Sequence, residues 1–121
     1  MAGNTGKTEI RLRVLEAELV RELTAALPAA TRNNSTFFFS SRYNPHALSA
    51  HMLSPQTEEL VSKAEEILSL RKALLLPTES SMAYLFLEAC AEISDLRNEQ
   101  RLGPRRLAQR LLDRLDELPL P

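Results

Sequence analysis

The sequence predicts an all-α fold: an irregular helical bundle of four longer helices plus one short helix, with a long loop at about residues 28–44. Hydrophobic residues make up 44% of the 121 residues, which is enough to build a core. Three glycines, four phenylalanines, two tyrosines and no tryptophan are too few for the turns and aromatic strands of a β-sandwich. Leucine and alanine recur at helical spacing between proline breaks. We expect residues 1–121 to form a single helical domain.

The first helix is expected at residues 8–27, after a disordered N-terminus of residues 1–7. Its apolar residues follow steps of three and four, which place them on one face of a helix. Pro28 is expected to end this helix, because proline disfavours helical geometry in the residue before it. The apolar face consists of Leu12, Leu15, Leu19, Leu23 and Ala26.

The connection that follows contains three consecutive phenylalanines, Phe37, Phe38 and Phe39. Loops this long inside a domain are commonly functional, and a polar linker has no physical need of three large apolar rings. We expect at least one ring to pack on the bundle and at least one to face a partner; the alternative is that all three cap the bundle. Asn44 and Pro45 then indicate the start of a short helix at residues 45–53.

Two helices are expected in the middle of the chain. Ser54 and Pro55 indicate the N-cap and the first residue of a helix that runs to about Leu76. A second helix is expected from Thr78, its N-cap, to about Leu102. The first half of that helix is apolar on nearly every side, which is typical of a helix at the centre of a fold. The residues expected to be almost fully buried there are Leu85, Phe86, Ala89 and Ile93.

The last helix is expected from about Pro104 to Leu118, because Gly103 and Pro104 form a strong stop and restart. Residues 119–121 are expected to form a tail. The apolar face of this helix consists of Leu107, Leu111, Leu115 and Leu118.

Charge is distributed unevenly along the chain, although the net charge is only −1. Residues 58–92 contain seven acidic and three basic residues, whereas residues 97–114 contain six arginines and two acidic residues. Within the second segment Arg106, Arg110 and Arg114 recur every four residues and form one stripe along a helix, the arginine stripe. Opposite patches of this kind can pair with a partner or with a second copy.

No motif in the sequence supports catalysis or a bound cofactor. Residues 6–8, Gly-Lys-Thr, match the end of a phosphate-binding loop but lack the earlier glycine and the preceding strand. The only histidines, His46 and His51, lie far along the chain from Cys90, whereas zinc needs three or four ligands at close spacing. Cys90 lies in an apolar run, where ionisation of the thiol is disfavoured. We therefore expect a protein that is not an enzyme, with no cofactor, no metal and no small-molecule substrate.

The chain is expected to be intracellular, in the cytoplasm or the nucleus. Residues 1–8 are polar and contain no apolar signal-peptide segment. No stretch approaches the roughly 20 apolar residues of a membrane span, so no membrane partner is expected. The single cysteine excludes an intrachain disulfide and suits a reducing compartment.

The favoured function is a non-catalytic protein–protein interaction module, either a subunit or adaptor of a larger assembly or a homodimer. The broad apolar faces of several helices exceed what a domain of this size readily covers alone. The partner would be another protein or a second copy, because arginine pairs well with carboxylates at interfaces. The alternative is a nucleic-acid-associated protein that binds phosphates with the arginine stripe. The candidate partner-binding residues are Phe37, Phe38, Phe39, Arg106, Arg110 and Arg114.

Overall fold

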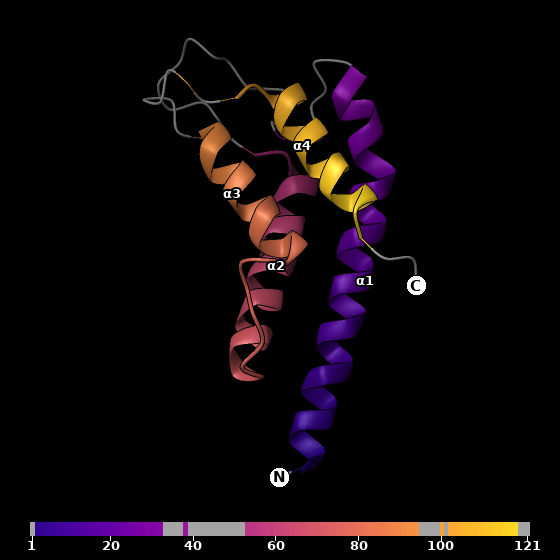
Figure 1. Ribbon diagram of the computed structural model, residues 1–121, viewed down its shortest axis with the longest axis vertical. Helices are drawn as coiled ribbons and strands as arrows, with labels where there is room; N and C mark the ends of the chain where they lie inside the picture. The colour runs from indigo at the N-terminus through magenta and orange to yellow at the C-terminus, as the bar shows by residue number, and fades with distance from the viewer. Residues whose placement is uncertain (1, 33–37, 39–52, 95–99, 101, 119–121) are drawn as a thin grey trace.

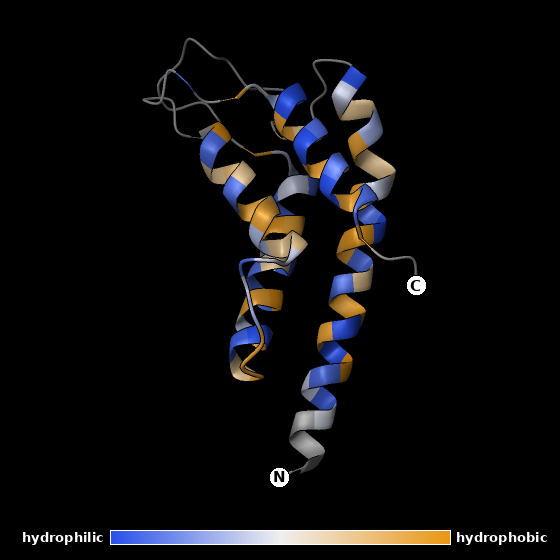
Figure 2. Cartoon of the chain, in the orientation of Figure 1, coloured by the Kyte–Doolittle hydropathy of each residue, from blue (hydrophilic) through white to orange (hydrophobic). Residues whose placement is uncertain are grey.

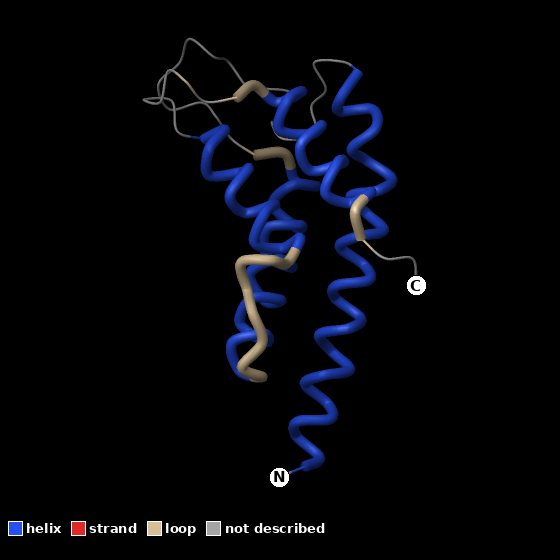
Figure 3. The backbone as a smooth tube through the Cα atoms, viewed as in Figure 1, coloured by secondary structure: helices blue, strands red, loops and turns tan. Residues whose placement is uncertain are grey.

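The computed structural model describes residues 2–32, 38, 53–94, 100 and 102–118, and within these residues the chain is built from α-helices (Figure 1). The helices are α1 (Ala2–Arg32), α2 (Pro55–Ala73), α3 (Met82–Ser94) and α4 (Pro104–Asp116). The described part of the chain contains no strand, and the described residues between α2 and α3 form a loop (Figure 3). The predicted all-α helical bundle is therefore confirmed. Of the short helix expected at residues 45–53, residues 45–52 lie outside the described ranges, and Leu53 is not helical.

Helix α1 is longer at both ends than the sequence predicts. It begins at Ala2, so that residues 2–7, expected to be disordered, form its first turns. Pro28 lies inside the helix and does not end it. Leu27 and Ala30 on either side of Pro28 are both buried. The free energy gained by burying them exceeds the cost of the backbone hydrogen bond that the proline nitrogen cannot donate. The hydroxyl of Thr31 donates to the Pro28 carbonyl at 2.8 Å, which gives that carbonyl a partner near the end of the helix.

Helix α2 begins where the sequence predicts. The Ser54 hydroxyl accepts a hydrogen bond from the Thr57 backbone N–H at 3.1 Å, and Pro55 occupies the first helical position. The backbone N–H of Ser54 donates to the Phe38 carbonyl at 3.0 Å, and this hydrogen bond positions the N-cap residue. The helix ends at Ala73, three residues before the predicted end at Leu76.

Helix α3 is shorter than predicted at both ends. Its N-cap is Ser81 and not Thr78: the Ser81 hydroxyl accepts from the Tyr84 N–H at 3.2 Å and donates to the Thr78 carbonyl at 2.7 Å. The described helix ends at Ser94, and Leu102 is not helical. The Leu102 N–H donates instead to a Glu92 carboxylate oxygen at 3.1 Å, which ties the chain before α4 back to α3.

Helix α4 begins at Pro104 after Gly103, as predicted, and ends at Asp116, two residues before the predicted Leu118. Three of its four predicted apolar residues are buried, namely Leu107, Leu111 and Leu115, whereas Leu118 is 38% exposed.

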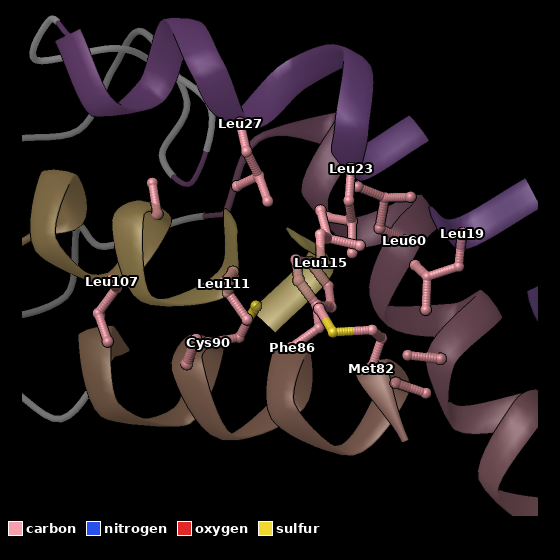
Figure 4. Packing of buried hydrophobic residues seen from close by; sticks show 14 of the residues in the cluster. Leu19, Leu23, Leu27, Leu60, Met82, Phe86, Cys90, Leu107, Leu111 and Leu115 are labelled. Atoms are coloured by element: carbon pink, nitrogen blue, oxygen red, sulfur yellow. The ribbon is translucent and has the colours of Figure 1, made fainter. Parts of the chain in front are cut away.

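The four helices form a ring in chain order. Helix α1 packs along both α2 and α4, and α3 packs along α2 and α4 with little contact to α1 (Figure 1). Hydrophobic and hydrophilic residues alternate along each helix, as expected when one face is buried (Figure 2). Side chains from all four helices meet in one core, which includes Leu23 of α1, Leu60 of α2, Phe86 of α3 and Leu111 of α4 (Figure 4).

Helix α3 therefore does not occupy the centre of the fold that its composition predicted. Phe86, Ala89 and Ile93 are buried as expected, but Leu85 is only partly buried, and Ala91 on the outer side is exposed. An apolar circumference did not bring burial on every side: of the described helices, α2 and α4 pack along α3, and α1 contacts it only slightly.

Candidate interaction surface

The turn that ends α2 has an unusual backbone. The Leu76 N–H donates to the Arg71 carbonyl at 2.8 Å, and the Leu75 N–H donates to the Lys72 carbonyl at 3.1 Å. This pair of hydrogen bonds is the Schellman motif, in which the residue after the C-cap adopts a left-handed conformation. Leu74 is the C-cap, and Leu75 is that left-handed residue, with φ of 58°. We call residues 74–77 the leucine turn.

Leucine is an unfavourable residue at this position. Glycine usually fills it, because a side chain in the left-handed region brings Cβ close to the following carbonyl oxygen, at a cost of roughly 1–2 kcal/mol. Leu75 is the one non-glycine residue with positive φ in the described part of the chain. The backbone strain is therefore concentrated in this turn.

The Leu75 side chain gains no burial in return for this strain. It is 92% exposed, and the neighbouring Leu76 is 42% exposed. Isolated exposed leucines are common on protein surfaces. A leucine that is both strained and exposed is different, because it loses backbone energy and recovers no hydrophobic energy in the single chain.

An ion pair and a hydrogen bond hold the leucine turn in place. Nε and Nη2 of Arg71 lie 2.9 and 2.7 Å from Oε2 of Glu16 on α1. Nη1 of the same guanidinium donates to the Pro77 carbonyl at 2.6 Å. One side chain thus fixes the turn to both α1 and α2, so Leu75 projects from an anchored backbone.

An apolar groove lies at the other end of the same loop. It has a volume of about 120 Å³ and is formed where the start of α3 approaches α1 and α2. Ser80 and Ser81 contribute polar atoms at its edge, beside the Glu16–Arg71 ion pair. Its apolar lining comes from Leu19, Val20, Ile67, Met82, Ala83 and Leu118, and we call it the apolar groove.

The phenylalanine segment contributes to the core at the one position that the structure describes. Phe38 is 1% exposed and belongs to the core cluster, so its ring is not available on the surface. Phe37 and Phe39 lie outside the described residues.

The arginine stripe is exposed along α4, but it is bordered by acidic residues. Arg110 and Arg114 line a groove of about 180 Å³ together with Glu88 and Glu92 of α3. Arg114 also pairs with Glu117 at 2.8 Å. Carboxylates this close reduce the attraction of the stripe for phosphate, because they oppose the positive potential locally.

Ion pairs lie along the contact between α1 and α2, and one of them engages Glu66 of the predicted acidic segment. Arg11 lies 3.0 Å from Glu66, and Lys63 lies 3.1 Å from Glu22. The hydrogen bond from Arg11 holds the pKa of the Glu66 carboxyl below its usual range. These pairs stabilise the antiparallel contact of α1 and α2.

Cys90 is buried in the core, where it faces α4 (Figure 4). Burial raises the pKa of its thiol to about 12, so the thiol is protonated and unreactive near neutral pH.

Among the described residues no group of three or more His, Cys, Asp or Glu side chains is arranged to hold a metal ion. None of the described helices has the length and apolar character needed to cross a membrane.

A second exposed apolar pair lies on α1. Ile10 is 65% exposed and Val14 is 45% exposed. With 100° of rotation per residue, they lie on the side of α1 opposite to buried Leu12 and Leu19. Both have ordinary helical backbone, so they carry no strain of the kind found at Leu75.

The leucine turn was missed by sequence reasoning, which placed residues 74–76 in a continuing helix. No signal in the sequence could have found it, because a run of leucines favours helix and no glycine marks the end of α2. No family model matches this chain, and no curated protein or solved structure matches it either.

Proposed function

We propose that this chain is a non-catalytic protein–protein interaction module that docks on its partner through the leucine turn. The observation that carries the proposal is Leu75, which combines a φ of 58° with 92% exposure. The fold alone would be served better by glycine at this position. Burial of the side chain in a complex would supply the hydrophobic energy that the single chain does not recover.

The anchored backbone of the leucine turn supports this function. Docking costs less conformational entropy when the contacting group is already fixed, and Arg71 fixes this turn through Glu16 and Pro77. An apolar side chain that projects from a fixed backbone therefore loses little conformational freedom when a partner buries it. Leu76 beside it adds further apolar surface.

A protein partner is favoured over nucleic acid by the surroundings of both surfaces. The leucine turn offers apolar contact and no cluster of cations, and the arginine stripe shares its groove with Glu88 and Glu92. Phosphate binding depends on positive charge that is not locally offset.

We also propose an intracellular location, in the cytoplasm or nucleus, because the lone buried thiol of Cys90 needs no oxidising compartment.

Photo-crosslinking from single positions tests the proposal. A photoreactive amino acid replaces Leu75 in one variant and Ile10, an exposed residue of α1 with ordinary helical backbone, in a matched control. Irradiation in native cell extract is expected to give defined protein adducts from position 75 and none from position 10. Affinity capture with Leu75→Gly should lose the same proteins. Equal crosslinking from both positions, or unchanged capture by Leu75→Gly, would contradict the proposal.

A further inference from the structure

We propose that the outer face of α1 binds an anionic lipid surface of the kind found on the cytoplasmic leaflet of membranes. This inference goes beyond the proposed function and is independent of it, because it uses no residue of the leucine turn. It concerns contact with lipid headgroups and not passage through the bilayer. It therefore departs from the expectation of no membrane partner, which rested on the lack of a spanning segment. We call this surface the cationic face, and its residues are Lys7, Ile10, Arg13, Val14, Ala17 and Arg21.

The cationic face lies on the side of α1 that the bundle leaves uncovered. Apart from Arg13, its residues recur at alternating steps of three and four between Lys7 and Arg21, which places them on one side of a helix. All six are exposed, with Ile10 at 65% and Val14 at 45%. The N-terminal end of α1 also extends beyond the other three helices (Figure 1). A flat surface can therefore approach this side of the helix.

The charged residues of the cationic face are all positive. Lys7 and Arg13 flank Ile10, each about 60° from it around the helix, and Arg21 lies about two turns beyond Val14 on the same side. Among the described residues no ion pair engages any of these three cations. Their charge is therefore available to an external anion.

The glutamates of α1 do little to offset this charge. Three of the four form ion pairs with α2: Glu16 with Arg71 at 2.7 Å, and Glu18 and Glu22 with Lys63 at 3.5 and 3.1 Å. These carboxylates are thus turned toward α2 and partly neutralised there. The fourth, Glu9, lies about 100° around the helix from the centre of the face. The local potential of the face is positive although the whole chain has a net charge of −1.

The apolar residues favour a lipid surface over the other anionic ligands. Nucleic-acid phosphates gain nothing from exposed aliphatic side chains, whereas at a membrane Ile10 and Val14 reach the boundary between headgroups and acyl chains. An acidic partner helix would need an apolar stripe over several heptads. Here Lys7 and Arg21 occupy the next positions of the three-and-four spacing and limit the stripe to three residues. A short apolar strip flanked by cations is typical of a helix that lies at a membrane surface.

Co-sedimentation of the full chain with lipid vesicles tests the inference. Wild type is expected to bind phosphatidylcholine vesicles that contain about 30% phosphatidylserine, and not to bind phosphatidylcholine alone. Arg13→Gln with Arg21→Gln should weaken binding about 25-fold, at about fivefold for each cation removed. Arg106→Gln with Arg110→Gln removes the same charge from exposed positions of α4 and should leave binding close to that of wild type. Equal losses in the two double variants would show that binding follows net charge, and would overturn the inference.

Tryptophan fluorescence tests which side of the chain meets the lipid. The chain contains no tryptophan, so one introduced indole reports only on its own position. With the phosphatidylserine vesicles, emission from Ile10→Trp should shift to shorter wavelength and be quenched by brominated acyl chains. Ala91→Trp, at an exposed position of α3, the helix with least contact to α1, should show neither effect. Equal shifts at both positions would contradict the proposed orientation.

The other anionic ligands are outcomes of the same test. A wild-type chain that fails to bind the phosphatidylserine vesicles overturns the inference, even if it binds duplex DNA or polyglutamate through Arg13 and Arg21. Because position 10 is expected to meet lipid and not protein, the absence of protein adducts from that position remains the expected result of photo-crosslinking. The proposed function is tested from position 75 and stands or falls separately.

Discussion

Nη2 of Arg71 lies 2.7 Å from Oε2 of Glu16, and this ion pair connects the end of α2 to α1. The two side chains are 20% and 31% exposed, so the pair is partly shielded from water. The same guanidinium also binds the Pro77 carbonyl, which extends the connection to the loop that leads to α3. The position of Leu75 therefore depends on a side chain that lies outside the turn itself.

Arg71→Ala is expected to lower the free energy of unfolding by about 1–2 kcal/mol, because a charge-assisted hydrogen bond and a partly shielded ion pair are lost. Chemical denaturation measures this change, and amide hydrogen exchange at Leu76 should accelerate as the turn loosens. Lys72→Ala serves as the control, because Lys72 is exposed. Equal effects of the two substitutions would show that Arg71 does not hold the turn.

Phe86→Ala is expected to lower the free energy of unfolding by about 3–5 kcal/mol, the usual range for a fully buried phenylalanine. The Phe86 side chain is 0% exposed and lies in the core (Figure 4). Glu88→Ala, at an exposed position of the same helix, should change stability by less than about 0.5 kcal/mol. A loss below about 1 kcal/mol for Phe86→Ala would contradict the packing described here.

Cys90 is expected to react slowly with thiol reagents in the native protein near pH 7, because burial raises the pKa of its thiol to about 12. Between pH 9 and 12 the unfolded chain loses this proton while the folded chain keeps it. The unfolded state then binds fewer protons, so stability falls as pH rises through this window, at most about 1.4 kcal/mol per pH unit. Cys90→Ala should lack this component in alkaline denaturation. If wild type and Cys90→Ala lose stability identically between pH 9 and 12, the Cys90 thiol is not the group responsible.

Pro28→Ala is expected to raise the free energy of unfolding by about 1–2 kcal/mol. The substitution restores a backbone N–H in the interior of α1 and removes a ring that disfavours helix. Ala29→Gly, at the exposed neighbouring position, should lower the free energy of unfolding by about 1 kcal/mol. A loss of this size would show that this turn of α1 is helical in solution. A less stable Pro28→Ala protein would instead indicate that α1 ends near this residue.

Local chemistry allowed several helix boundaries to be predicted from the sequence. Ser54 with Pro55, and Gly103 with Pro104, determine where α2 and α4 begin, because each acts through its own side chain or backbone. The boundary at Pro28 was predicted wrongly because burial of the residues around it outweighs local preference.

Other features depend on geometry that residue types do not determine. Thr78 and Ser81 are both suitable N-caps, and only the fold decides which hydroxyl reaches a free N–H. The leucine turn could not be predicted, since a run of leucines favours helix and carries no information about φ at Leu75. The apolar groove combines residues from α1, α2, α3 and the C-terminal end of the described chain, so no single segment reveals it.

Leu75→Gly, examined in one preparation for both folding and association, tests the central claim most directly. Glycine adopts φ of 58° without strain, so the free energy of unfolding, measured at concentrations where the chain is monomeric, should stay the same or rise by up to about 1 kcal/mol. Association through the leucine turn should be lost in the same protein. A variant that is less stable as a monomer, yet associates as well as wild type, would show that Leu75 serves the fold and would contradict this account.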